Sequence, residues 1–432
     1  MKIYKCGPTA SFCPRPRKFI VPSAWRTTGS DCGAVINGKC QRALRRRREK
    51  ENDKMDNALG YKYSYIEVDL RQIRENIRHI QEATDCGIIP VVKSNAWGQG
   101  TVPVARMLFE KAGFDVVAVA HVSEAAEIRE AGFRDQTIML LSGMPFHAIP
   151  YAVKYDLMMM VYNCETVERL SSEVRKAGLE RFPIQIKIDT GFHRIGVPPE
   201  KLDELLDAIE AAGNLEIAGV CSHYADSYNP DSEKTPEQYE LFKKMVAHVK
   251  ARGITPRYIS IGCSPDIDRP DEISTHMRVG WGYIAYTPAG YLADYHGNRP
   301  SLTLRAFITD MHELKAGDSL GYSNVVLDKP ATTATISIGY GDGLYRPSTM
   351  HGGPLLIRGQ YAHYLDECMD QTIIDVTGID CKVGDEVTIY GKDKYSDAYL
   401  TPTEVSKYAD GNSTILQLYL TDRIARIYVD EN

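Results

Sequence analysis

From residue 64 onward, short apolar runs alternate with segments whose apolar residues recur at helical spacing. Segments 123–132 and 236–253 have this helical period, and Gly253 supplies a stop signal for the second. The apolar runs have the length of buried strands. Eight of them occur before residue 283: 88–93, 115–120, 137–142, 156–162, 184–190, 217–223, 258–262 and 276–282.

This alternation predicts an α/β fold with a (β/α)8 TIM barrel over residues 64–298, and a doubly wound sheet is the alternative. After residue 299 the pattern changes to strands separated by Gly and Asp turns, and only 403–409 has helical character. A mostly β C-terminal domain is therefore expected over 299–432, completed by the strand near 64–69. Its expected strands are 325–338, 354–357, 372–376, 386–390 and 424–429.

The charge is divided unevenly along the chain of 432 residues. Residues 1–54 carry 14 Lys and Arg against 4 acidic residues, a net +10, so the remaining 378 residues carry −16 of the total −6. An acidic body argues against nucleic acid as the main partner. Residues 1–54 lack a sustained period and the apolar core of a signal peptide. They are interpreted as a disordered extension, as sequence preceding a natural start at Met55, or as a basic targeting or nucleic-acid patch.

The cysteines and the overall composition indicate the setting of the protein. The chain is 43% hydrophobic and 25% charged, as in ordinary soluble globular proteins. Its ten cysteines show neither a disulfide framework nor zinc-ligand spacing, so a cytoplasmic protein without a metal is expected. No apolar run approaches the roughly 18 residues needed to cross a bilayer, and no membrane partner is expected.

Polar side chains that could take part in catalysis or binding occur at the ends of the predicted barrel strands, where barrel enzymes place their catalytic groups. Taken singly, Lys93 could be a surface lysine and His223 a core histidine. Together, a lysine, small residues in the turns after the last strands and an arginine on the eighth strand suit pyridoxal phosphate. The residues in these positions are Lys93, Lys187, Asp189, His193, Arg194, His223, Cys263, Ser264, Arg278 and Gly280.

Four sequence motifs occur in an order that resembles the alanine racemase family, the barrel class of pyridoxal phosphate enzymes. They are VVKSNAWGQG at 91–100, KIDTGFHRIG at 187–196, SIGYGDGLYR at 337–346 and CMDQTIIDVT at 368–377. The resemblance covers about residues 65–429 and leaves out the N-terminal extension. It implies an amino-acid racemase with pyridoxal 5'-phosphate as its cofactor.

The resemblance also implies a role for individual barrel residues. Lys93 would hold the cofactor and act as one base, and Arg278 would contact the pyridine nitrogen with support from His223. Because a guanidinium keeps its protons, the ring would stay unprotonated, which restrains side reactions. Lys187 matches a lysine that is often carbamylated. The remaining cofactor contacts would come from Trp97, Arg194, Ser264, Gly280 and Trp281.

In the β domain the resemblance implies that Tyr322 is the second base, although a tyrosine in such a turn is more commonly structural. Met369 and Asp370 would bind the substrate carboxylate together with Arg194, and Tyr340 would lie at the entrance. In the family these β-domain residues reach the barrel of the other subunit. A head-to-tail homodimer acting on a small amino acid is therefore expected.

Some residues depart from the family pattern, and they leave the substrate open. Trp97 replaces a tyrosine near the phosphate, where its indole N–H could donate, and Cys263 stands where Asn is common. Asp366 replaces an entrance arginine, and a pocket tyrosine is either missing or replaced, with Gln417 as the candidate replacement. An acidic entrance would favour lysine or ornithine, a polar Gln would favour serine, and the family favours alanine. A decarboxylase of the same barrel class and a non-catalytic cofactor carrier are the other candidates.

Overall fold

The computed structural model describes residues 59–269, 271–285, 296–408 and 413–429, all within one unit that spans 54–432. The expectations for residues 1–54 lie outside the described residues. The helix α2 (Leu70–Ala83) illustrates how the sequence determines the elements of the fold. The Asp69 carboxylate accepts a hydrogen bond from the backbone N–H of Gln72 (2.8 Å) and caps the helix. Ile73, Ile77 and Ile80 then recur on one face and are fully buried.

All eight expected barrel strands are present and parallel, and the structure confirms the TIM barrel rather than a doubly wound sheet. Isolated bridges Val91–Ala118, Met139–Met158 and Cys263–Arg278 link the strand groups, so the sheet closes on itself. The strands are β2 (Gly87–Pro90), β3 (Val116–Val119), β4 (Thr137–Leu140), β5 (Met159–Val161), β6 (Phe182–Lys187), β7 (Leu215–Cys221), β8 (Tyr258–Ser260) and β9 (His276–Val279).

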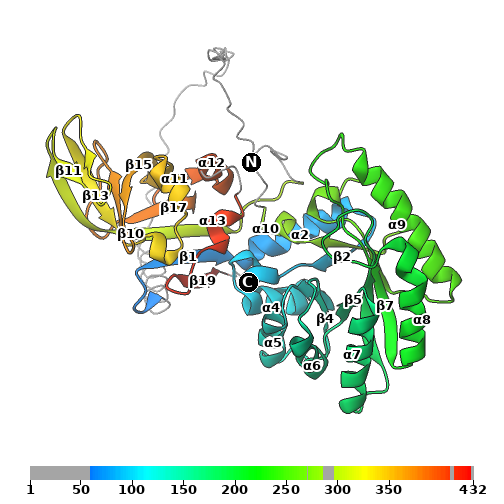
Figure 1. The fold of residues 1–432 in the computed structure, drawn as a ribbon. Helices are drawn as coiled ribbons and strands as arrows, with labels where there is room; N and C mark the ends of the chain where they lie inside the picture. The colour runs from blue at the N-terminus through cyan, green and yellow to red at the C-terminus, as the bar shows by residue number, and fades with distance from the viewer. Residues whose placement is uncertain (1–58, 270, 286–295, 409–412, 430–432) are drawn as a thin grey trace, which may run out of the picture. The chain divides into compact units, whose positions relative to one another are not determined.

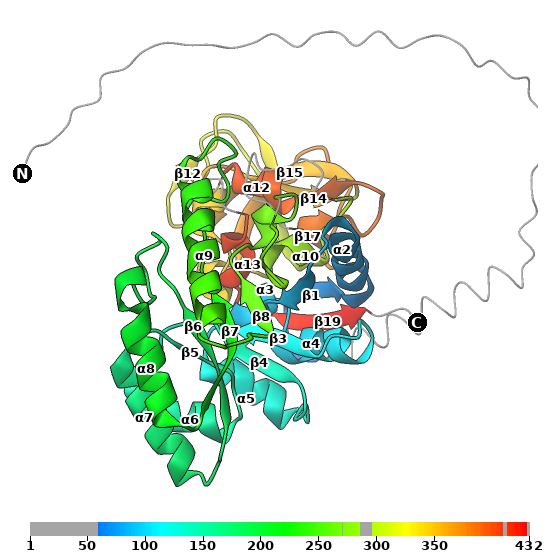
Figure 2. The same ribbon diagram turned by 90° about the vertical axis from the view of Figure 1, so that its right-hand side faces the viewer.

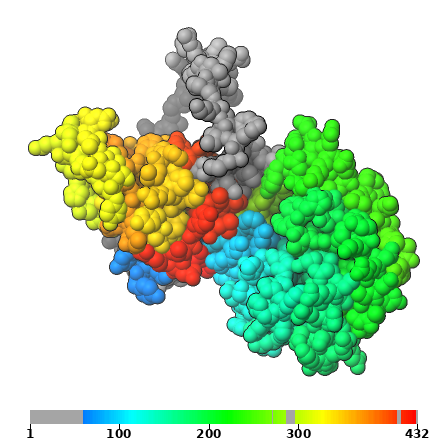
Figure 3. Space-filling model, in the orientation of Figure 1, coloured from blue at the N-terminus to red at the C-terminus, as the bar shows by residue number. Residues whose placement is uncertain are grey.

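Helices follow most of these strands and cover the outside of the barrel (Figure 1). The space-filling view shows their side chains, cyan to green, as a continuous outer surface (Figure 3). After β8 and β9 the helical pieces are short, η3 (Ser264–Asp266) and α10 (Trp281–Ile284). The outer helices are α4 (Thr101–Glu110), α5 (Val122–Glu130), α6 (Ile149–Lys154), α7 (Cys164–Lys176), α8 (Leu202–Ala212) and α9 (Lys234–Ala251).

The strands after the barrel form a nine-stranded sheet together with β1 (Ser64–Asp69). β1 pairs antiparallel with β10 (Leu302–Leu314) and parallel with β19 (Ala425–Val429), which lies beside it in Figure 2. The first and the last strands of the described chain, β1 and β19, therefore lie side by side in the same sheet. The other strands of this sheet are β13 (Ala331–Ile336), β14 (Pro354–Ile357), β15 (Gln360–Glu367), β16 (Thr372–Asp375), β17 (Glu386–Lys392) and β18 (Tyr399–Leu400).

The secondary structure of this part corrects several expectations. The single strand expected at 325–338 is two strands, β12 (Val325–Val326) and β13, because the turn containing Pro330 interrupts it. β10 and β15 were not predicted. Besides α12 (Pro402–Ser406), near the expected helix, there are two further short helices, α11 (Arg346–Met350) and α13 (Ile415–Leu418). No helix in the described ranges is both long and apolar enough to cross a membrane.

Candidate active site

Lys93 begins an unusual backbone turn at the end of the first barrel strand. The next four residues all have left-handed φ: Ser94 (55°), Asn95 (56°), Ala96 (48°) and Trp97 (59°). Such a run is unfavourable for residues with a Cβ and persists only when neighbours fix it. The Asn95 side chain accepts from the Thr101 N–H (3.0 Å), and the Ser94 N–H donates to the Glu124 carboxylate. Neither Asn95 nor Glu124 was singled out from the sequence.

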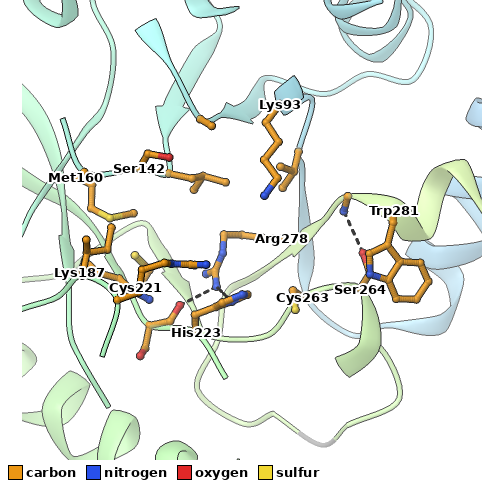
Figure 4. A pocket seen from close by; sticks show the side chains of 18 of the residues that line it. Lys93, Ser142, Met160, Lys187, Cys221, His223, Cys263, Ser264, Arg278 and Trp281 are labelled. Atoms are coloured by element: carbon orange, nitrogen blue, oxygen red, sulfur yellow. Dashed lines mark hydrogen bonds between the residues drawn. The ribbon is translucent and has the colours of Figure 1, made fainter. Parts of the chain in front are cut away.

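Lys93 opens into a cavity of about 520 Å³ at the C-terminal ends of the barrel strands. Figure 4 shows the Lys93 and Arg278 side chains extending into this cavity from different strands. Lys187 and Arg194 also line it, and no Asp or Glu occurs among its described lining residues. Burial, and then the charge of Arg194, lowers the pKa of Lys93, which favours the neutral amine.

The Arg278 guanidinium is held in place by backbone carbonyls. Its Nη1 donates to the Ser260 carbonyl (2.9 Å), and its Nη2 donates to the carbonyls of Ser222 (2.7 Å) and Ile261 (2.9 Å). Nη2 also lies 3.3 Å from Nδ1 of His223 (Figure 4). Burial, and then the charge of Arg278, holds the pKa of His223 well below its usual range, so Nδ1 is free to accept. The structure therefore brings His223 and Arg278, two of the residues expected at the cofactor, into contact.

Lys187 and Arg194 add two further cations to the cavity. Lys187 is 6% exposed, and burial lowers its pKa to about 7. The guanidinium carbon of Arg194 lies 4.3 Å from the centroid of the Phe192 ring, a cation–π contact that fixes the side chain. Asp189, from the same segment, instead accepts from the backbone N–H groups of Gly191 and His193 (both 3.0 Å). It organises the turn, as expected.

The turns after β8 and β9 form a cradle at one side of the cavity. The Ser264 Oγ accepts from the backbone N–H groups of Gly280 (3.1 Å) and Gly282 (3.2 Å). Figure 4 shows Ser264 and Trp281 on this side of the cavity. Trp281 stacks on Tyr228 and donates from its indole to the Tyr228 hydroxyl (2.7 Å). Two converging N–H groups beside a serine hydroxyl suit a phosphate group.

Trp97 corrects one expectation about the phosphate contacts. Its indole N–H donates to the Val91 carbonyl (2.9 Å) and is therefore not directed to a ligand. The Trp97 ring instead lies against Gly280, where a Cβ would come within 2.6 Å of it. The side chain thus shapes the cavity wall and contacts Lys93, whose Nζ lies 5.4 Å from the ring centroid.

The β-domain candidates do not line this cavity in their own chain. Tyr322 is 79% exposed, at the tip of the hairpin formed by β11 (Ser319–Leu320) and β12. Met369 is 52% exposed, and Tyr340 lies in the nearby turn η4 (Tyr340–Asp342). The Asp370 carboxylate accepts from the Arg423 guanidinium (2.7 Å), a partner that the motif did not reveal. The structure thus separates the candidates into a barrel group and an outward-facing group.

The two departures that bear on substrate choice are both buried. Asp366 is 5% exposed and accepts hydrogen bonds from Ser323, which argues against a free acidic group at the entrance. Gln417 is fully buried, and neither of its amide atoms has a hydrogen-bond partner in the described chain. Its backbone carbonyl packs against Gly98, 2.7 Å from where a Cβ would stand, beside the turn that follows Lys93.

The fold and the cavity together define a class of protein. Its members have a parallel barrel joined to a β sheet, and the ends of the barrel strands carry a buried lysine and a cradle that suits a phosphate group. The comparisons narrow this class. The family described as "Alanine racemase, N-terminal domain" matches residues 68–288, and "Alanine racemase, C-terminal domain" matches residues 301–428. The chain belongs to the alanine racemase family.

Individual relatives extend this likeness over nearly their whole length. An alanine racemase from Methanococcus maripaludis is 31% identical over 337 residues, which cover 76% of this chain and 89% of the relative. The structure of alanine racemase from Streptomyces lavendulae matches with a TM-score of 0.79 and 28% identity, over 86% of this chain and 98% of that one. Alanine racemase from Bacillus anthracis with bound L-Ala-P matches with the same TM-score and identity, over 86% and 96%.

Proposed function

We propose that this protein interconverts the L and D enantiomers of alanine with pyridoxal 5'-phosphate as cofactor. The relatives named alanine racemase support this activity. The observation that carries the proposal is the single cavity in which Lys93, Arg278 and the Ser264–Gly280 cradle meet without a carboxylate among its described lining residues.

The residues of the cavity fit this cofactor. Its aldehyde would bind the Lys93 amine. Its phosphate would accept hydrogen bonds from the N–H groups of Gly280 and Gly282, which donate to the Ser264 hydroxyl in this structure. The fixed guanidinium of Arg278 would address the pyridine nitrogen, and Arg194 the phenolic oxygen. When bound, the cofactor withdraws electrons from the α-carbon of the amino acid and makes its proton removable.

Inversion needs two bases on opposite faces of the α-carbon. Lys93 suits one face, because its lowered pKa favours the neutral amine that accepts the α-proton. Tyr322 would serve the other face, and Met369 and Asp370 would hold the substrate carboxylate together with Arg194. Tyr340 would lie at the entrance. Since these β-domain residues do not line the cavity of their own chain, we infer that a second copy supplies them in a head-to-tail dimer.

The choice of substrate can be decided by a panel of L-amino acids assayed for formation of the D enantiomer. Alanine is expected to react fastest. Serine is the second candidate, as the replacement of a pocket tyrosine by Gln417 suggests, but Gln417 is not among the described residues that line the cavity. The buried and hydrogen-bonded Asp366 gives no support to lysine or ornithine. Release of carbon dioxide would identify a decarboxylase, and bound cofactor without any turnover would identify a carrier.

The Lys93→Ala variant tests the cofactor assignment. It is expected to lose racemisation and the absorbance of the lysine-bound cofactor, because no other described lysine except Lys187 lines the cavity. Lys250→Ala, a change of an exposed lysine on α9, is the matched control and should keep both. Retention of the absorbance by Lys93→Ala would overturn the assignment.

A further inference from the structure

The backbone that carries Tyr322 is the tip of a very short hairpin. Its strands β11 and β12 have two residues each, paired as Ser319–Val326 and Leu320–Val325, and backbone hydrogen bonds between Leu327 and residues Gly317 and Asp318 close its base. A two-stranded hairpin of this size is marginal on its own. Because the Tyr322 side chain is 79% exposed, it packs against little of its own chain and does not hold the tip in place. The position of this tyrosine must therefore be fixed through its backbone neighbours.

Asp366 makes the contacts that fix this tip. Its Oδ2 accepts from the backbone N–H of Ser323 (3.0 Å), and its Oδ1 accepts from the Ser323 hydroxyl (2.7 Å). Burial of the carboxyl opposes ionisation, but the hydroxyl and N–H of Ser323, followed by the backbone of Glu367 and of Tyr322, hold its pKa below the usual range. The ionised carboxylate thus binds the residue that directly follows Tyr322, through both its main chain and its hydroxyl, with charge-assisted bonds.

A β-bulge directs Asp366 toward the hairpin. Along β15, Tyr364 pairs with Ile374 and Asp366 pairs with Ile373, so Leu365 is an extra residue without a partner of its own in β16. A bulge of this kind changes the direction in which the following side chain points. Asp366 is 5% exposed, and a buried carboxylate without hydrogen-bond partners would be costly. The bulge brings this carboxylate to its partners in the hairpin.

Gly321 shows that the hairpin and the carboxylate fit each other closely. Its φ is +65°, which favours glycine, and a Cβ there would lie 1.8 Å from Oδ2 of Asp366. The Asn324 N–H closes the same tip on the Gly321 carbonyl (3.3 Å). The tip is therefore shaped to let the carboxylate reach the amides next to Tyr322.

We propose that Asp366 is a positioning residue for Tyr322: it anchors the hairpin tip from which this base projects toward the second subunit. The inference rests on the proposed function, in which Tyr322 is the second base. It replaces the interpretation of Asp366 as an acidic group that selects cationic substrates. Small displacements of a catalytic group lower the rate strongly, so the anchor matters for the chemistry.

The test compares Asp366→Ala with Asp328→Ala, which removes an exposed carboxylate from the segment that follows the same hairpin. In Asp366→Ala the amide of Ser323, which donates to the carboxylate, should exchange with deuterium faster in the cofactor-free protein. Racemisation of alanine should fall about ten- to hundredfold, mainly in kcat. Asp366→Asn should retain part of the activity, because its carbonyl still accepts one hydrogen bond. Asp328→Ala should resemble the wild-type protein in every readout.

A second readout separates positioning from a general structural defect. When Tyr322 is misplaced, Lys93 still removes and returns the α-proton on its own face. In D2O, one enantiomer of alanine should then gain deuterium faster than it inverts in Asp366→Ala, and the ratio should stay normal in Asp328→Ala. If inversion and exchange fall together, or if the exchange of the Ser323 amide is unchanged, the positioning role is wrong.

Tyr322→Phe distinguishes this failure from a failure of the proposed function. It should lose inversion and keep the one-sided exchange, whatever the role of Asp366. If Tyr322→Phe racemises normally, the second-base assignment fails. If Tyr322→Phe behaves as expected and Asp366→Ala behaves like the wild type, only the positioning role fails.

Discussion

The barrel cavity and the β-domain candidates are built in opposite ways. In the barrel, Lys187 and Arg278 are 6% and 7% exposed, and their neighbours fix them. In the β domain, Tyr322 and Met369 are 79% and 52% exposed and meet no part of the cavity of their own chain. Buried cations are costly and persist where an anion or a dense set of acceptors compensates them. Under the proposed function, the buried barrel residues would form the binding part of one site, and the exposed β-domain residues would complete the site of a second chain.

The largest expected effect follows directly from this comparison. Lys93→Ala and Tyr322→Phe should each be nearly inactive, but a mixture that exchanges subunits should recover about a quarter of the wild-type activity. Half of the dimers would be mixed, and each would contain one site with both native bases. The measurement is racemisation of alanine before and after subunit exchange.

The control for this mixing experiment is the double variant Lys93→Ala/Tyr322→Phe. Mixed with Lys93→Ala it should recover nothing, because no site then contains both bases. If mixed dimers form, as native mass spectrometry can show, and the two single variants recover no activity, then both bases come from one chain. The inference that one chain supplies Lys93 and the other supplies Tyr322 would then be wrong.

The two halves also differ in how far the sequence predicts them. All eight barrel strands were predicted, because buried parallel strands appear as apolar runs such as 88–93. β10 was missed because its pattern includes Arg305, which is 4% exposed, with its Nε 3.8 Å from Glu386. A buried charged pair looks like a surface position in the sequence. The prediction was therefore best where burial is purely apolar.

The candidate residues were found through motifs, whereas their supporting contacts were not. The left-handed turn from Ser94 to Trp97 contains no glycine, and Asn95 alone is a residue type that favours such φ values, so composition does not reveal a run of four. The bulge at Leu365 likewise depends on register, which pairing decides rather than composition. The sequence alone therefore predicts Asp366 as a changed entrance residue, whereas its hydrogen bonds to Ser323 give it a place inside the β domain.

The β domain contains a buried acid whose effect on stability can be measured. Glu367 is 2% exposed, and burial raises its pKa to about 7, although the Thr349 hydroxyl donates to it (2.7 Å). Between about pH 4.5 and 7 the unfolded chain loses this proton while the folded chain keeps it, so the free energy of unfolding falls as pH rises. Glu367→Gln should remove this loss and stabilise the protein by up to about 3 kcal/mol at pH 8.

Urea unfolding at pH 5 and pH 8 checks this prediction. The advantage of Glu367→Gln should be clear at pH 8 and small at pH 5, and Glu240→Gln on the exposed side of α9 should show no such difference. An equal effect at both pH values would mean that lost packing or hydrogen bonding, and not ionisation, explains the change.

The barrel holds the opposite case, a buried base, and gives the smallest expected effect. Burial lowers the pKa of Lys187 to about 7, so above that pH its amine is neutral and can react with carbon dioxide. The carbamate forms by loss of one proton and places a negative charge near Arg194 and Arg278, which would orient Arg194. Lys187→Met should reduce racemisation about tenfold, the size of one charge-assisted hydrogen bond.

Carbon-13 NMR with labelled bicarbonate detects this modification. A carbamate resonance is expected at pH 8, and it should fade as the pH drops below about 7, because the protonated amine cannot react. Lys187→Met should lack the resonance, and Lys176→Met, which changes an exposed lysine, should keep it. If Lys187→Met retains the resonance, another group is modified. If the wild-type protein shows none at pH 8, the cations of the cavity are neutralised by the bound cofactor and substrate alone.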